Sequence, residues 1–148
     1  MCLFIPNKLN LKYKRYHRAH LIPKITKFIN FPHIRSGVLG LKILNFGFLL
    51  PNQLKALYYT LNKLLKKKAV IIFFAFPNSS LTSKPTGARM GKGKGKNLSS
   101  WIFRTVAGFI LCEIHTKFLK LAISALKIAK KKLPICSKIV YNLKIKTF

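Results

Sequence analysis

The segment from Lys84 to Lys96, which reads KPTGARMGKGKGK, most restricts how this chain can fold. It has four glycines, four lysines and one arginine, and no carboxylate. A segment so poor in apolar side chains must lie outside the core. Its glycines free the backbone for positive φ and let main-chain N–H groups approach an anion such as phosphate. The alternative is a flexible, solvated basic linker. Arg89-Met90 and the apolar segments on both sides favour a binding loop presented by a folded domain.

The charge of the whole chain indicates a polyanionic partner. One acid, Glu113, stands against 29 lysines and arginines, which gives a net charge of +28 over 148 residues. A compact monomer with this charge would repel itself, and a polyanion relieves that repulsion. The basic residues are spread along almost the whole chain, a pattern typical of a protein embedded in nucleic acid. Structural RNA is therefore the expected partner.

The same acid count argues against an enzyme. Carboxylate-pair hydrolysis and aspartate-oriented triads need acids that this chain lacks, so no catalytic residue, cofactor or small-molecule substrate is expected. The cysteines, Cys2, Cys112 and Cys136, are too scattered for paired zinc-binding spacing. Cys112 and His115 form an isolated C-x-x-H, for which a buried thiol and a surface imidazole are the simpler interpretation.

A membrane-spanning helix is not expected either. Such a helix needs about 20 apolar residues, whereas the longest apolar run, Ala69 to Phe76, has the length of a strand.

Residues 1–36 are predicted to form a basic arm. A long helix is improbable there because of Pro6, Pro23 and Pro32. Basic residues are mixed with aromatic ones between Leu9 and His20. We expect the cations to pair with phosphates while the rings stack on bases. A solvated tail is the alternative. The candidate RNA-binding residues in the arm are Lys12, Lys14, Arg15, His17 and Arg18. Those in and beside the glycine-rich segment are Lys84, Arg89, Met90, Gly91, Lys92, Gly93, Lys94 and Lys96.

Periodicity predicts a single domain of strands and two helices over residues 1–148. Strands are expected at Leu39–Leu50, Val70–Phe76, Trp101–Ile114 and Ile135–Ile145, with a turn at 77–80 and a basic loop over 77–100. A first helix is expected after a cap at Asn52, with the apolar stripe Leu54, Leu57, Tyr58, Leu61, Leu64 and Leu65. A second is expected from Lys117 to Lys132 after a cap at Thr116, with the stripe Phe118, Leu121, Ala122, Ala125, Ile128 and Ala129 and a lysine face of Lys120, Lys127 and Lys131.

Four blocks in order resemble the L-sixteen family of large-subunit ribosomal proteins. The signature R-M-G-x-G-K-G is similar to Arg89–Gly95, preceded by Phe76-Pro77 and Lys84-Pro85. The family's basic opening resembles Pro6–Arg18, its first-helix start resembles Gln53–Ala56, and its closing A-x-x-(L/I)-A-x-x-K-(L/M)-P-I resembles Ala125–Ile135. The chain departs from the family at Lys55 and Cys136, and in the glycine turn expected after Gly108–His115.

The resemblance implies an α+β fold of the hammerhead type, a mixed, largely antiparallel sheet carrying two helices. It also implies a non-enzymatic place in the large ribosomal subunit near the central protuberance and the A-site tRNA, with large-subunit rRNA, tRNA and neighbouring ribosomal proteins as partners.

A mitochondrial ribosome is the expected location, with a plastid as the alternative. The domain begins almost at Met1, which leaves no room for a presequence, and the residue choice suggests an AT-rich genome. Two other classes stay open: a basic membrane-surface protein, for which the amphipathic lysine helix would speak, and a nonspecific DNA-binding nucleoid protein.

Overall fold

The computed structural model describes residues 34–91 and 93–142 of the chain. Its elements are β1 (Leu39–Ile43), β2 (Gly47–Leu49), α1 (Pro51–Leu65), β3 (Val70–Phe73), β4 (Ser79–Ser83), β5 (Asn97–Thr105), β6 (Ile110–His115), α2 (Leu119–Lys130) and β7 (Ser137–Tyr141). Every strand pair among these elements is antiparallel. The predicted α+β class, with two helices and largely antiparallel strands, is confirmed.

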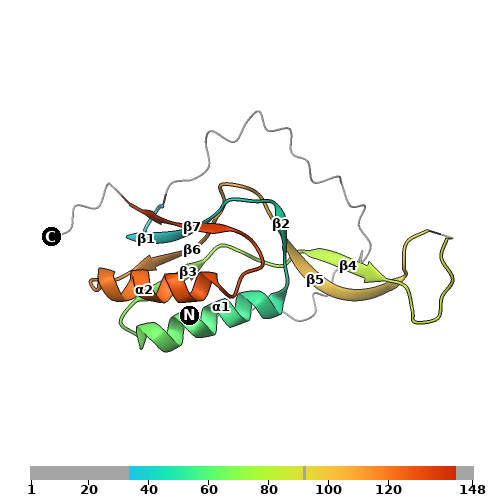
Figure 1. Cartoon of the computed structure of the whole chain (residues 1–148), viewed down its shortest axis with the longest axis horizontal. Helices are drawn as coiled ribbons and strands as arrows, with labels where there is room; N and C mark the ends of the chain where they lie inside the picture. Colours follow the sequence, from blue (N-terminus) through green and yellow to red (C-terminus); the bar gives the residue numbers. More distant parts are fainter. Residues whose placement is uncertain (1–33, 92, 143–148) are drawn as a thin grey trace.

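The strands form two sheets with different surroundings. We call the four-stranded sheet, in the order β3-β6-β1-β7, the body sheet, and the three-stranded sheet, in the order β2-β5-β4, the hairpin sheet. Figure 1 shows α1 and α2 side by side along one face of the body sheet, whereas β4 and β5 extend away from it. The main core therefore lies between the two helices and the body sheet.

Two predicted strands each turn out to be two strands. The predicted strand Leu39–Leu50 contains β1 in the body sheet and β2 in the hairpin sheet. At the start of β2, a Cβ on Gly47 would come within 2.7 Å of the Ile135 side chain, so a larger residue there would require that side chain to move. The predicted strand Trp101–Ile114 contains β5 and β6, separated by a turn in which Gly108 has φ +89°.

Helix α1 has the predicted buried face but a different start. The helix begins at Pro51, and Leu50, not Asn52, is the N-cap residue. The side-chain oxygen of Gln53 accepts a hydrogen bond from the Leu50 N–H at 2.9 Å, which satisfies a donor at the helix start. The fully buried side chains follow the predicted three- and four-residue spacing, at Leu54, Leu57, Leu61 and Leu65.

Helix α2 is shorter than predicted, and its buried face matches the predicted stripe only in part. It runs from Leu119 to Lys130, and Phe118, not Thr116, is its N-cap residue. The Thr116 hydroxyl lies before the helix, where it accepts from the Phe118 N–H and donates to the Lys68 carbonyl, both at 3.1 Å. Its buried residues are Ala122, Ala125, Leu126 and Ala129. The predicted stripe residues Ala122, Ala125 and Ala129 are thus buried, whereas Phe118, Leu121 and Ile128 are exposed and Leu126 packs in the core instead.

Other observed boundaries differ from the predicted ones, chiefly where β4 and β5 pair. Strand β3 ends at Phe73, and the predicted turn at 77–80 already holds the first two residues of β4. The loop predicted over 77–100 is consequently limited to residues 84–96, which we call the basic loop. The last strand, β7, covers Ser137–Tyr141 of the predicted Ile135–Ile145. Most of the predicted arm lies outside the described residues.

Candidate nucleic-acid interface

The basic loop is held at the end of a β-hairpin. Strands β4 and β5 pair from Ser79↔Ile102 to Ser83↔Asn97, so the segment that leaves Ser83 returns directly opposite. Figure 1 shows the loop at the far end of this hairpin, well away from α1, α2 and the body sheet. The hairpin thus presents the loop outward from the main core.

The glycines of the basic loop do two different things. Gly87, Gly91 and Gly93 have φ values of +85°, +90° and +80°, and a Cβ on any of them would meet open space. They are needed for a left-handed backbone, which confirms the prediction for Gly91 and Gly93, whereas the same prediction for Gly95 is wrong. Gly95 is needed for room, because a Cβ there would collide with the Ser83 carbonyl across the hairpin.

Lys84 braces the loop from inside. Its ammonium donates a hydrogen bond to the Arg89 carbonyl at 3.4 Å and another to the Gly91 carbonyl. These contacts draw the outer part of the loop back onto its first residue. In the structure Lys84 therefore shapes the loop, a role that its place in a basic run did not suggest.

The other predicted residues of the loop point outward. Arg89, Met90, Lys94 and Lys96 are exposed, and Met90 is 96% exposed. They surround an open hollow of about 400 Å³. Since the chain's one acid lies in β6, no carboxylate side chain neutralises these cations. This arrangement of long-stemmed cations, accessible backbone and one bare apolar side chain suits a sugar–phosphate surface.

Several predicted site residues cannot be placed or lie on another element than the basic loop. Lys92 and the arm residues Lys12, Lys14, Arg15, His17 and Arg18 lie outside the described residues. The lysine face predicted on α2 exists: Lys120, Lys127 and Lys131 are exposed, on a different element from the basic loop.

Glu113 has a structural role that the sequence reasoning missed. Its side chain is only 1% exposed. Its Oε1 accepts from the Arg35 N–H at 3.0 Å, and its Oε2 accepts from the N–H groups of Ser36 and Gly37 at 3.1 and 3.0 Å and from the Ser36 hydroxyl at 3.2 Å. The carboxylate thus fixes the segment that enters β1.

The protonation state of Glu113 follows from these contacts. Burial alone would raise the pKa of its carboxyl, but the N–H donors of Arg35, Ser36 and Gly37 and the Ser36 hydroxyl lower it, and the net pKa lies below the ordinary value. The available signals in the sequence were that Glu113 is the sole acid and that it lies in a β-rich run. Neither pointed to partners 76 to 78 residues away.

The other candidate chemistry finds no support among the described residues. Cys112 is buried, and burial raises the pKa of its thiol to about 12, so it is an unreactive core side chain, as predicted. No three His, Cys, Asp or Glu side chains within residues 34–91 and 93–142 cluster as a metal site would require. In the same ranges neither helix is long and apolar enough to cross a membrane.

Comparison with known proteins gives one consistent result. The sequence profile of the family described as "Ribosomal protein L16p/L10e" matches residues 9–140. The large ribosomal subunit protein uL16c of Euglena longa is 34% identical over 88% of this chain and 94% of its own length. The uL16 proteins of Akkermansia muciniphila and Thermosipho africanus are 32% and 35% identical, over 89% and 88% of this chain and 91% and 89% of their own.

These matches agree with the resemblance found in the sequence and cover the body sheet, both helices and the basic loop. The family consists of structural constituents of the ribosome, so the chain is not an enzyme. The chain belongs to the ribosomal protein L16p/L10e family, and is a constituent of the large ribosomal subunit.

Proposed function

We propose that this protein binds large-subunit rRNA through the basic loop and its N-terminal arm, near the central protuberance and beside the A-site tRNA. One observation carries the proposal. A hairpin holds Arg89, Met90, Lys94 and Lys96 in solvent, away from the core and from the chain's only acid. A constituent of the ribosome with such a loop has an obvious counter-charge in rRNA, with neighbouring ribosomal proteins and tRNA as further partners.

Each part of the loop has a separate task in this proposal. Arg89, Lys94 and Lys96, with Lys92, neutralise phosphates and release bound counterions, so affinity falls steeply with salt. Left-handed Gly91 and Gly93 expose N–H groups to phosphate oxygens, and Met90 packs on a sugar or a base. Lys84 keeps the loop closed while these contacts form.

The arm supplies a second set of contacts. Lys12, Lys14, Arg15 and Arg18 pair with phosphates, and the ring of His17 stacks on an unpaired base. We propose that residues 1–148 act as a single rRNA-binding unit, in which residues 1–36 are the arm and the segment 77–100 carries the basic loop.

A mitochondrial ribosome is the proposed location, with a plastid ribosome as the alternative. The support is the richness of the chain in lysine, isoleucine, phenylalanine and asparagine, which AT-rich codons specify. Immunodetection in purified mitochondria and plastids tests this assignment independently of RNA binding.

Sucrose-gradient fractionation, followed by rRNA binding of the purified chain at several salt concentrations, tests the function. We expect the protein to travel with large subunits, and log affinity to fall linearly with log salt. Lys94→Gln with Lys96→Gln should lower that slope by about two, because each substituted lysine no longer neutralises a phosphate. The matched control, Lys127→Gln with Lys131→Gln, removes the same charge from α2 and should lower it less.

Three results would contradict the proposal. They are equal affinity at low and high salt, a preference for duplex DNA over rRNA, and co-sedimentation with lipid vesicles without any rRNA. The second would favour a nucleoid protein and the third a membrane-surface protein.

A further inference from the structure

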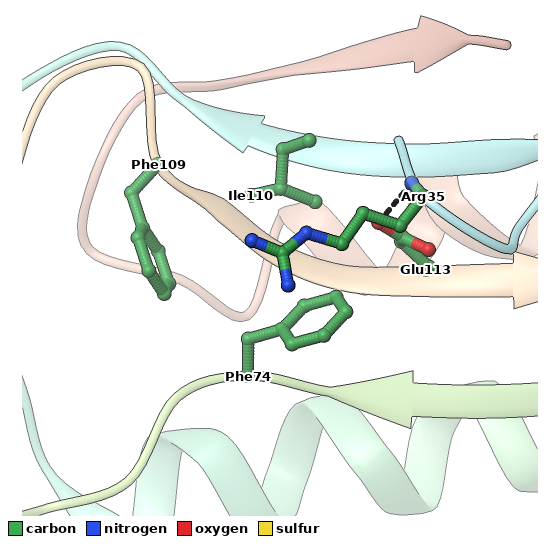
Figure 2. Close-up of a pocket in the computed structure, with 5 residues that line it drawn as sticks. All are labelled: Arg35, Phe74, Phe109, Ile110 and Glu113. Atoms are coloured by element: carbon green, nitrogen blue, oxygen red, sulfur yellow. Dashed lines mark hydrogen bonds between the residues drawn. The ribbon is translucent and has the colours of Figure 1, made fainter. Parts of the chain in front are cut away.

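A small cavity lies on the body sheet, away from the basic loop. Its volume is about 130 Å³, and Arg35, Phe74, Phe109, Ile110 and Glu113 line it (Figure 2). Along β6, Glu113 alternates with Cys112 and Ile114, which belong to the core under the helices. Because successive side chains of a strand point to opposite faces, the cavity opens on the face that α1 and α2 leave uncovered.

The cation in this cavity lacks an acidic partner. The backbone N–H of Arg35 binds Glu113, while its side chain extends away from the carboxylate toward Phe109 and Phe74 (Figure 2). Both carboxylate oxygens are already taken by donors from residues 35–37. Within the part of the chain that the structure describes, the exposed guanidinium therefore has no carboxylate to pair with.

The two phenylalanines that line the cavity, Phe74 and Phe109, each contact a neighbouring part of the fold. Phe74 follows β3, and its N–H donates to the Leu111 carbonyl at 3.0 Å, yet its side chain is 39% exposed. The Phe109 ring packs against Phe103, with 5.3 Å between the ring centroids. Phe109 is thus held through its ring and Phe74 through its backbone, and the Phe74 ring keeps an exposed surface beside Arg35.

We propose that this cavity binds one unpaired base of large-subunit rRNA, stacked on Phe74, with the phosphate of the same nucleotide paired to Arg35. The inference rests on the proposed rRNA-binding function and adds a further site to the basic loop and the arm. The cavity is smaller than the roughly 300–1,000 Å³ of a site for a small molecule or cofactor. A single flat base matches a ring platform with a cation at its edge, since unpaired RNA bases are bound by aromatic stacking and arginine.

Charge favours RNA over a segment of a neighbouring protein as the occupant. Arg35 has no acid available within the described chain, and the net charge of +28 favours a polyanion such as nucleic acid as the partner. A peptide would also leave the guanidinium unpaired unless it supplied its own carboxylate. The test below makes a protein occupant a recognisable outcome.

Filter binding of the full-length chain to large-subunit rRNA tests the stacking contact. Phe74→Ala should weaken binding about tenfold, the order expected for removal of one base–aromatic stack. Phe74→Trp should restore it, which a defect in folding would not allow. Phe76→Ala is the matched control, because Phe76 is 45% exposed on the same linker but does not line the cavity.

Chemical probing of the rRNA and the salt dependence of binding identify the ligand. One base should be protected in complexes of the wild type and of Phe76→Ala, and reactive in complexes of Phe74→Ala. Arg35→Gln should lower the slope of log affinity against log salt by about one.

If rRNA affinity and base protection were unchanged in Phe74→Ala and Arg35→Gln while the wild type bound rRNA, this inference would be overturned but the proposed function would not. Photocrosslinking from position 74 to protein but not to rRNA in purified large subunits would have the same consequence. Failure of the wild-type chain to bind rRNA at all would overturn the proposed function as well.

Discussion

The body of the molecule, by which we mean the body sheet with α1 and α2, is stabilised in the opposite way to the basic loop. In the body, Leu57 and Leu61 are fully buried, and Glu113 is saturated by four hydrogen bonds. In the basic loop, Met90 is 96% exposed, and the internal side-chain bonds come from Lys84. The body contains its own stabilising contacts, whereas the loop has a shape but leaves its charge unmatched. The proposed binding of an external anion would supply the missing counter-charge, and the following changes test that contrast from the largest expected effect to the smallest.

Leu61→Ala should have the largest effect on the body. Leu61 is fully buried on α1, and removal of a buried leucine side chain costs about 2–5 kcal/mol through reduced burial and the remaining cavity. Urea unfolding in high salt, which screens the charge repulsion, measures the change. Asn62→Ala, on the exposed side of the same helix, should change stability by less than about 0.5 kcal/mol. Equal losses of stability in the two variants would contradict the described core.

Glu113→Ala should destabilise the fold by about 2–3 kcal/mol. The reason is that the N–H groups of Arg35, Ser36 and Gly37 lose their acceptor in a largely buried place. Glu113→Gln keeps one acceptor oxygen and should be destabilised less. If Glu113→Ala unfolds at the same urea concentration as the wild type, or a higher one, the carboxylate does not brace the segment before β1.

Gly95→Ala should disturb the hairpin that carries the basic loop and leave the body unchanged. The added methyl collides with the Ser83 carbonyl, so the hairpin end must open, at a cost of about 1–3 kcal/mol. Hydrogen exchange should increase in β4 and β5 but not in α1, and rRNA affinity should fall. Gly91→Ala, where the methyl meets open space, costs only the left-handed strain of about 1–2 kcal/mol. Unchanged exchange in both variants would mean that the hairpin end is not closed as described.

Acid should weaken the body through Glu113. Its pKa is lower in the folded state than its ordinary value of about 4.3, so the folded state favours the carboxylate. The corresponding stabilisation is fully present above that pH and is lost as the pH falls through the lower, folded-state pKa. Unfolding curves recorded from neutral pH to below pH 4 should show this loss in the wild type and lack it in Glu113→Gln. Parallel curves for the two proteins would exclude Glu113 as the source.

Lys94→Gln should leave the unfolding midpoint almost unchanged. The side chain is exposed on the basic loop, where substitutions alter stability by no more than about 0.5 kcal/mol. A clear loss of stability without RNA would show that the loop contributes to the core.

Features with a local pattern were predictable from the sequence. The spacing of Leu54, Leu57, Leu61 and Leu65 predicted the buried face of α1, and glycine and lysine content predicted an uncovered loop around Arg89. The chain's place in its family followed from four short blocks in order. In each case a few neighbouring residues contain the whole signal.

Features that depend on distant residues were not predictable. The division of Leu39–Leu50 between two sheets depends on distant strands, because β1 pairs with β6 and β7 whereas β2 pairs with β5. The burial of Leu126 on α2 depends on how that helix packs on the core. The partners of Glu113 lie 76 to 78 residues away in sequence. The cavity beside Phe74 arises only when the body sheet forms.

The most direct test of the central claim is photocrosslinking from position 90 in purified large subunits. A photoreactive amino acid in place of Met90, which is 96% exposed, reports what the basic loop touches in its native particle. The same group at Tyr59, which is 66% exposed on α1, is the control for crosslinking from another exposed site. We predict crosslinks from position 90 to large-subunit rRNA, and more of them than from position 59. Crosslinks from position 90 to protein alone, or none at all, would contradict the claim that the basic loop lies against RNA.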